Sequence, residues 1–235
     1  MQLALRPMKT LVIDVGGTHV KLLATGKKSP VSFESGPDMT PKKMVLNTLQ
    51  SVSGWTFDNV SIGYPGPVVK GKPVEEPPNL GPGWVRFDFE KALGRPVKVI
   101  NDAAMQAMGS YEGGRMLFLG LGTGLGSTLI ADGVLQPMEL AHLPYKHGRT
   151  YEEYVGKNGL KRLGEKRWRH HVVKVIAQLK HALQADYVVL GGGNAKRFTG
   201  LPPGCRQGDN ANAFRGGFRL WQDRSQFANG KKTVY

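Results

Sequence analysis

The sequence has little cysteine, little acid and no long apolar run. Cys205 is the only cysteine in 235 residues, so no internal disulfide and no cysteine-based zinc site can form, which fits a reducing cytoplasm. No apolar run approaches the roughly 20 residues that a membrane-spanning helix needs. Lys and Arg number 32 against 18 Asp and Glu, a net charge of +14. Such an excess favours polyanions: nucleic acid, an acidic membrane surface or a highly charged phosphate compound.

Two apolar runs of strand length, 11–15 and 20–24, flank a glycine-rich turn. This pattern predicts a β-hairpin. Glycines let another group approach the backbone, and successive N–H groups in such a turn bind anions, phosphate above all. The alternative is an ordinary hairpin with an acid that is buried by chance. The groups concerned are Asp14, Gly16, Gly17, Thr18 and Lys21.

Two more glycine-rich turns follow later strand-like runs, at 122–126 and 191–193. The first alternates as GxGxGxG and so lacks the dinucleotide fingerprint, and the chain contains no GxxxxGK[ST] phosphate loop. A flexible hairpin is the alternative, but Thr123 offers a hydroxyl to a phosphate oxygen. Three such turns indicate an α/β protein that assembles a phosphate-binding site from distant segments.

Helix signals occur between these strands. Thr40 as N-cap and Pro41 at the first position predict a helix over 41–53. Helical spacing dominates the stretch that ends at Ala185, and 209–221 is predicted to form a final amphipathic helix.

Asp102 is the candidate for chemistry, since it follows a predicted strand over 97–100 and starts a helix. A carboxylate there can accept the hydroxyl proton when a phosphoryl group is transferred to an alcohol. It can equally cap the free N–H groups of the helix. Glu139 and His142, three residues apart, could hold a metal or a polar ligand, or form a surface pair. The basic run 157–180 is either a track for a polyanion or a solvated helix face.

In their order along residues 9–221, the motifs resemble those of the ROK sugar kinases, within the actin-like/hexokinase ATPase superfamily. The matching pieces are Asp14-Val-Gly-Gly-Thr-His-Val-Lys21, Gly63-Tyr-Pro-Gly66, Asn79 before Trp84, Asn101-Asp102-Ala-Ala, Gly120 to Gly126, Glu139-Leu-Ala-His142, Tyr151 to Gly156 and Leu190-Gly-Gly-Gly-Asn194.

The resemblance implies an α/β, bilobal, ribonuclease-H-like fold with a central cleft. Residues 1–101 would form a small N-terminal lobe, onto which a helix at about 209–221 packs back, and residues 102–208 a large C-terminal lobe. Asp102 would be the base for the sugar 6-hydroxyl. Other hydroxyls would be held by Asn79, Asn101, Glu139, His142 and Glu152. The donor phosphates, with Mg²⁺ on Asp14, would be cradled by Asp14, Gly16, Gly17, Thr18, Lys21, Gly122, Thr123 and Gly124. The adenosine of ATP would lie at Gly191, Gly192 and Gly193.

The chain departs from the typical family pattern in two places. It lacks the cysteine-rich zinc motif, as the polyphosphate-dependent glucokinases do, and Ala141 replaces the glycine of Glu-x-Gly-His. We therefore expect a homodimeric, cytoplasmic glucokinase that uses inorganic polyphosphate, or also ATP, with no nucleic-acid or membrane partner. The alternatives are an ATP-only hexokinase acting on glucose, mannose or fructose, and a non-catalytic protein that binds a polyanion such as nucleic acid.

Overall fold

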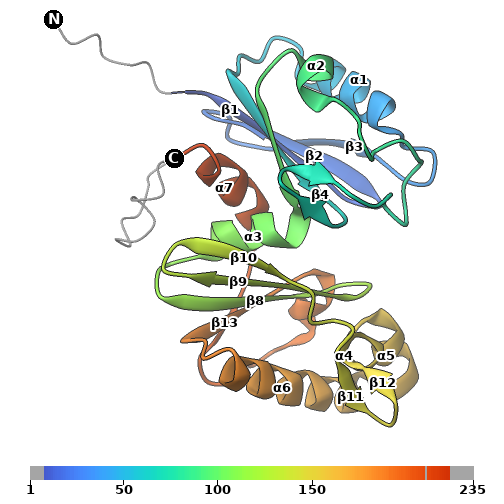
Figure 1. Cartoon of the computed structure of the whole chain (residues 1–235), viewed down its shortest axis with the longest axis vertical. Helices are drawn as coiled ribbons and strands as arrows, with labels where there is room; N and C mark the ends of the chain where they lie inside the picture. Colours follow the sequence, from blue (N-terminus) through green and yellow to red (C-terminus); the bar gives the residue numbers. More distant parts are fainter. Residues whose placement is uncertain (1–7, 210, 223–235) are drawn as a thin grey trace, which may run out of the picture. The chain divides into compact units, whose positions relative to one another are not determined.

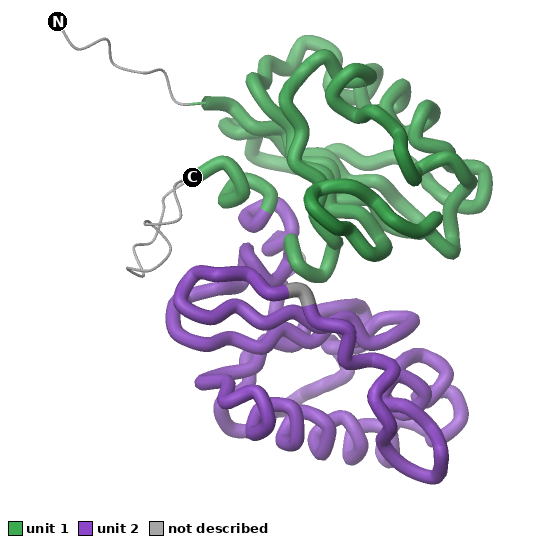
Figure 2. Tube along the Cα trace, in the orientation of Figure 1, with its two compact units in different colours: residues 1–105, 217–222, 233–235 green, residues 106–216, 223–232 purple. Residues whose placement is uncertain are grey.

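The structure, a computed structural model, describes residues 8–209 and 211–222 (Figure 1). These form two compact units, which are coloured separately in Figure 2. Unit 1 contains residues 8–105 and Gly217–Gln222, and unit 2 contains residues 106–209 and 211–216. Residues 1–7 of the predicted small lobe and Asn210 of the predicted final helix lie outside the described residues.

Unit 1 is built on a five-stranded mixed sheet in the order β3-β2-β1-β4-β7. The first three strands in the chain are antiparallel neighbours, whereas β1, β4 and β7 run parallel. The carboxyl ends of these three parallel strands therefore lie at one edge of the sheet. The strands are β1 (Thr10–Val15), β2 (His19–Ala24), β3 (Val31–Glu34), β4 (Asn59–Tyr64) and β7 (Val97–Asn101), and a small hairpin is formed by β5 (Val68–Val69) and β6 (Lys72–Pro73).

Two helices complete this part of unit 1, α1 (Pro41–Ser51) and α2 (Phe89–Leu93). The predicted cap of α1 is present, because Thr40 Oγ1 accepts a hydrogen bond from the Lys43 N–H at 3.3 Å. The helix ends two residues before the predicted position. Its buried face joins a core that includes the fully buried side chains of Trp84 and Tyr64.

The end of the described chain is tied to the centre of this sheet. Ser61 Oγ in β4 donates to the carbonyl of Gly217 at 2.6 Å and accepts from Trp221 Nε1 at 2.9 Å. Gly217 has no room for a side chain, because a Cβ atom there would collide with Val12. Segments more than 150 positions apart in the sequence are thus packed together.

Unit 2 repeats the strand order and the strand directions of unit 1. Its sheet runs β10-β9-β8-β13-β14, with the first three antiparallel and β8, β13 and β14 parallel. Two copies of one five-stranded topology therefore make up the chain. These strands are β8 (Arg115–Leu121), β9 (Leu125–Ala131), β10 (Val134–Met138), β13 (Tyr187–Gly191) and β14 (Cys205–Gln207).

The stretch up to Ala185, where helical character was predicted to dominate, contains three helices preceded by a small hairpin of β11 (Pro144–Lys146) and β12 (Arg149–Thr150). Breaks occur at Gly156 and Gly164, and Gly164 has a positive φ of 73°. Trp168 is fully buried and donates to the carbonyl of Val155 at 2.8 Å. The remaining helices are α3 (Asp102–Ser110), α4 (Tyr151–Val155), α5 (Lys157–Leu163), α6 (Glu165–Ala182), η1 (Gly193–Arg197) and α7 (Asn212–Arg219). None of the helices described here has both the length and the apolar character for a membrane span.

Candidate active site

The shared strand edge of unit 1 collects the first set of predicted site residues. In the register of the sheet, Asp14 of β1 lies opposite Gly63 of β4, and Gly63 lies opposite Ile100 of β7. β7 ends at Asn101, and Asp102 is the first residue of α3. Since the three strands are parallel, Asp14 and Asp102 come to the same edge although they are distant in the sequence. A side chain at Gly63 would collide with Met105, so glycine lets α3 approach the strand.

Asp102 has an altered acidity. Burial, followed by the nearby negative charge of Asp14, raises its pKa from 3.8 to about 7, although its Oδ1 accepts the Ala103 N–H at 2.8 Å, which acts in the opposite direction. Burial likewise raises the pKa of Asp14, against the effect of the positive charge of Lys21, which lies opposite it in the β1–β2 register. Two desolvated carboxyl groups at one strand edge favour a cation or a proton between them.

Asn101 holds the start of α3 in place. Its Oδ1 accepts the N–H of Ala104 at 3.1 Å, and its Nδ2 donates to the carbonyl of Gly66 at 3.0 Å. The helix-capping function that the sequence allowed for Asp102 is therefore shared with its neighbour. The Asp102 carboxylate accepts hydrogen bonds from the Ala103 N–H and from its own backbone N–H, which hold it in place at the start of α3.

Hydrogen bonds within the turn and from Ser35 stabilise the turn between β1 and β2. The Gly16 N–H donates to the His19 carbonyl at 3.0 Å, so this N–H closes the turn itself. Ser35 supports the turn twice, through Oγ to the Gly16 carbonyl at 2.6 Å and through its N–H to the Thr18 carbonyl at 2.9 Å. Within the described residues, the N–H groups of Gly17 and Thr18 have no acceptor. They are the anion-binding donors that this turn offers.

Asn79 lies against the same turn, since a Cβ added at Gly17 would lie 3.3 Å from the Asn79 Cβ. The Asn79 side chain is otherwise exposed. Nothing in the local sequence pattern marks Ser35 as a supporting residue of this turn, because its hydrogen bonds join segments that are about 20 residues apart.

The second set of predicted residues lies in unit 2. The loop 122–124 joins β8 to β9 and is held at two carbonyl groups: the Lys157 N–H donates to the Thr123 carbonyl at 3.0 Å, and Asn194 Nδ2 donates to the Gly122 carbonyl at 3.1 Å. Gly192 has a φ of +81° and packs on the Leu121 backbone, where any side chain would clash. The turn 191–193 and the loop 122–124 are therefore neighbours.

Glu152 connects this loop with the turn that follows β10. Its Oε2 accepts the Leu125 N–H at 3.2 Å, and its own N–H donates to the Ala141 carbonyl at 3.0 Å. Glu139 and His142 flank Ala141 and are exposed, with Oε1 and Nε2 separated by 3.9 Å. The structure thus brings Glu139, His142 and Glu152 to one region of unit 2.

A magnesium ion fits the donor set at Asp14. Mg²⁺ prefers hard oxygen ligands and is typically bound by one or two carboxylates together with substrate phosphates. In residues 8–209 and 211–222 no group of three or more His, Cys, Asp or Glu side chains could hold a metal by itself. Burial disfavours the ionised form of the Asp14 carboxyl group. A magnesium ion that is also bound to phosphate oxygens would stabilise this ionised form.

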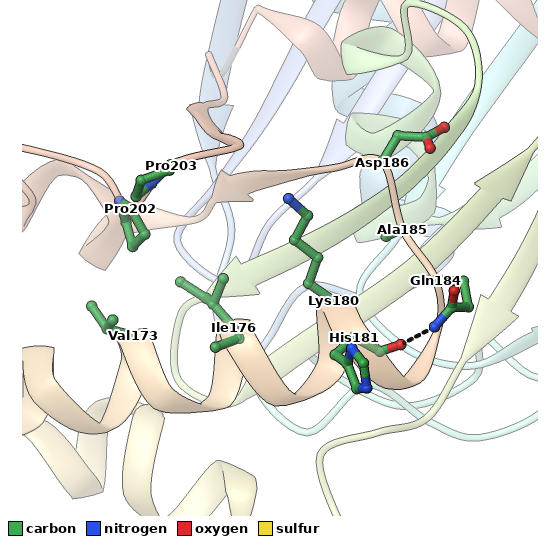
Figure 3. A pocket seen from close by; sticks show the side chains of 10 residues that line it. Val173, Ile176, Lys180, His181, Gln184, Ala185, Asp186, Pro202 and Pro203 are labelled. Atoms are coloured by element: carbon green, nitrogen blue, oxygen red, sulfur yellow. Dashed lines mark hydrogen bonds between the residues drawn. The ribbon is translucent and has the colours of Figure 1, made fainter.

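A cavity of about 550 Å³ in unit 2 lies away from these residues (Figure 3). It is bounded by Val173, Ile176 and Lys180 of α6 on one side and by Pro202 and Pro203 on another. The Asp186 carboxylate at its edge already accepts the Arg115 N–H at 2.7 Å. None of the predicted site residues lines this cavity, so we place the candidate site at the strand edges.

Two five-stranded sheets of the same order, each carrying glycine-rich turns at its strand ends, define the actin/hexokinase-like ATPase fold. Solved structures agree. A polyphosphate/ATP-glucomannokinase from Arthrobacter sp. strain KM superposes with a TM-score of 0.74 at 23% identity, over 89% of this chain and 96% of that one. A ROK family glucokinase from Streptomyces griseus, in complex with glucose and AMPPNP, gives 0.69 at 17% identity, over 90% and 98%. The predicted fold class is confirmed.

Sequence comparison identifies the family. The model of the ROK family matches residues 10–137, more than half of the chain. A polyphosphate glucokinase of Mycobacterium tuberculosis is 26% identical over 211 residues, which cover 79% of this chain and 77% of that protein. The chain belongs to the ROK family, and the resemblance seen in its motifs is confirmed.

Proposed function

We propose that the protein is a glucokinase that transfers a phosphoryl group from inorganic polyphosphate, or also from ATP, to the 6-hydroxyl of glucose. The observation that carries the proposal is Asp102, a carboxyl group with a pKa near 7 at the strand edge that also holds Asp14. A base with a pKa near the working pH is well matched to taking a proton from a hydroxyl.

In this proposal Asp102 accepts the 6-hydroxyl proton as the sugar oxygen attacks the terminal phosphorus. The bond from that phosphorus to its bridging oxygen breaks, and the donor leaves as polyphosphate shortened by one phosphate, or as ADP. Asn101 keeps the base in position through its bonds to Ala104 and Gly66. The free N–H groups of Gly17 and Thr18 donate to phosphate oxygens. A magnesium ion on Asp14 would neutralise charge on the donor phosphates.

Sugar recognition is assigned to two groups of polar side chains. In unit 1, Asn79 and Asn101 supply amide groups, and in unit 2, Glu139, Glu152 and His142 supply acceptors and a ring nitrogen. A polyol needs such a mixture of donors and acceptors. In unit 2, the donor phosphates would contact the loop 122–124, and an ATP adenosine would contact the turn 191–193.

Two observations support polyphosphate as the donor. The mycobacterial relative bears the name polyphosphate glucokinase, and the chain has a net charge of +14, which raises the local concentration of a long polyanion. The competing assignment is an ATP-only hexokinase. The intact turn 191–193 is compatible with it, because this turn would contact the adenosine of ATP.

The test is the rate of glucose 6-phosphate formation with Mg²⁺, with polyphosphate and ATP compared at matched phosphate concentration. We expect turnover with both donors and a higher kcat/KM with polyphosphate. Turnover with ATP alone identifies the competing hexokinase. No turnover with either donor on glucose, mannose or fructose contradicts the kinase assignment.

The quaternary structure and location stay predictions. We expect a homodimer, which light scattering coupled to size-exclusion chromatography measures directly. We also expect a cytoplasmic enzyme that does not bind duplex DNA at physiological salt, and fractionation and a DNA-binding titration test these two points.

A further inference from the structure

Half of the net positive charge of the chain is concentrated in one segment of unit 2. Residues 144–182 contain ten Lys and Arg and three Glu, a net charge of +7 out of the total of +14. This segment forms the β11–β12 hairpin and the helices α4, α5 and α6, which lie together in the yellow to orange part of Figure 1.

The three acids in this segment are already engaged. Glu152 accepts the Leu125 N–H, and Glu153 closes the capping box of α4 by accepting the Thr150 N–H at 2.8 Å. Glu165 forms ion pairs with Arg169 and Arg197. Arg162 donates to the Glu153 carbonyl at 2.9 Å. The ion pairs found within residues 8–209 and 211–222 leave six other exposed cations of the segment without an acidic partner: Lys146, Lys157, Lys161, Lys166, Arg167 and Lys174.

Two of these cations, Lys146 of β11 and Lys174 of α6, act on the same side chain although they come from different elements. His171 of α6 hydrogen-bonds through Nδ1 to the Tyr145 hydroxyl of β11 at 3.0 Å. Burial lowers the pKa of His171, and so does positive charge from His170, Lys146, Lys174 and Arg162. Charged groups from β11, α5 and α6 therefore lie close enough to His171 to lower the pKa of its imidazole.

The charged region also adjoins the candidate donor loop. Lys157, the first residue of α5, donates its N–H to the Thr123 carbonyl at 3.0 Å. From there α5 leads through Gly164 directly into α6, whose 18 residues span about 27 Å. The run of basic helices α5 and α6 therefore begins beside the loop 122–124.

Like charges four residues apart on a helix destabilise it. Lys157 and Lys161 have this spacing on α5. The folded chain therefore carries unfavourable repulsion that a bound polyanion would relieve.

We propose that the exposed cations Lys146, Lys157, Lys161, Lys166, Arg167 and Lys174, here called the α5–α6 basic surface, bind the distal part of a linear inorganic polyphosphate whose reacting end contacts the loop 122–124. This inference rests on the proposed function, since it locates the part of the donor that does not react. Long chains would use the surface, whereas ATP would not reach it.

The chemistry of the surface favours a polyanion without bases. Single-stranded nucleic acid is bound on exposed aromatic rings that stack with the bases. The aromatic side chains of α4 and α6 are not exposed: Tyr154 and Trp168 are buried, and Tyr151 is half-buried. Anchoring on a membrane surface needs an exposed apolar face as well as charge, but the apolar face of α6 lies in the core and leaves Val173 as its one exposed large apolar side chain in the described chain.

The test compares two variants with equal loss of charge. The first is Lys166→Ala, Arg167→Ala and Lys174→Ala on α6, and the control is Lys42→Ala, Lys43→Ala and Lys72→Ala in unit 1, where the three side chains are also exposed. Steady-state kinetics with long-chain polyphosphate, tripolyphosphate and ATP are measured as a function of salt, after thermal melts have shown that both variants are folded.

The α6 variant is expected to raise the KM for long-chain polyphosphate on the order of tenfold or more and to flatten its salt dependence, because three phosphate contacts are lost. The KM values for tripolyphosphate and ATP should stay near the wild-type values, and the control variant should change none of them.

The same KM for long-chain polyphosphate in both variants overturns the inference but leaves the proposed function standing. A wild-type protein that uses ATP and no polyphosphate overturns both. Duplex DNA that competes with long-chain polyphosphate as well as polyphosphate itself, at equal phosphate concentration, contradicts the choice of occupant.

Discussion

Replacing Asp102 with asparagine removes the proposed base with little change of shape. The amide oxygen of the new side chain can still accept the Ala103 N–H, so the start of α3 should keep its geometry. A neutral amide cannot take the hydroxyl proton. General-base catalysis typically contributes about 10²–10⁴-fold, so we expect kcat to fall by about this factor while the KM for glucose changes little.

The same substitution should increase stability, and the sign follows from the pKa. The Asp102 carboxyl group releases its proton near 3.8 in the unfolded chain and at about 7 in the folded one. The folded state therefore loses stability as the pH rises from about 4 to about 7. A pKa difference of about 3 corresponds to about 4 kcal/mol, which is an upper limit because the side chain keeps partial contact with solvent. Asparagine does not ionise, so the Asp102→Asn variant does not lose stability in this way as the pH rises.

The assays are steady-state kinetics with saturating donor and urea unfolding at about pH 5 and about pH 8. Asp102→Asn should gain stability over the wild type mainly at the higher pH. Asp132→Asn, at an exposed carboxylate in the turn after β9, is the matched control and should alter neither quantity. A variant whose kcat stays within about tenfold of the wild type would refute the assignment of the base. Equal stability gains at both pH values would refute the raised pKa.

Three further outcomes are expected. The kcat/KM for glucose should rise with pH through about 7, as the general base ionises, and level off above about 8; a flat profile from pH 6 to 8 would exclude a base with this acidity. Ser61→Ala removes the bonds to Gly217 and Trp221 and should lower the free energy of unfolding by about 1–3 kcal/mol in urea titrations; an unchanged midpoint would mean that the chain end is not held there. Gly124→Ala places a methyl group where the Glu152 carboxylate lies, so the KM for glucose should rise with a smaller change in kcat, and an unchanged KM would remove Glu152 from the sugar site.

Local signals in the sequence were sufficient where a few neighbouring residues decide the outcome. The cap at Thr40 and the proline after it set the start of α1, and the glycine-rich turn 16–17 set the first hairpin. The ends of elements were harder to predict. The hairpin of β11 and β12 was missed, and the helix breaks at Gly156 and Gly164 were not predicted, because they depend on packing against other elements.

Some features of the candidate site could likewise be predicted from local sequence, and others could not. The residue types and their order along the chain marked Asp102 and the glycine turns, which are visible without any coordinates. The support given by Ser35 and the bond from Asn101 to Gly66 could not be predicted, since each joins segments that are far apart in the sequence. Nor could the altered acidity of Asp102, because burial and the charge of Asp14 cause it and both arise on folding.

The sequence by itself determined the class of fold, the family, the excess of positive charge and the identity of the acid proposed as the base. These are properties of composition, local pattern and motif order. The tertiary structure decided which N–H groups of the first turn remain free, that Asp14 raises the pKa of Asp102, and that Lys157 at the start of α5 adjoins the loop 122–124. Distances between remote side chains set electrostatic and hydrogen-bond energies, and only folding fixes those distances.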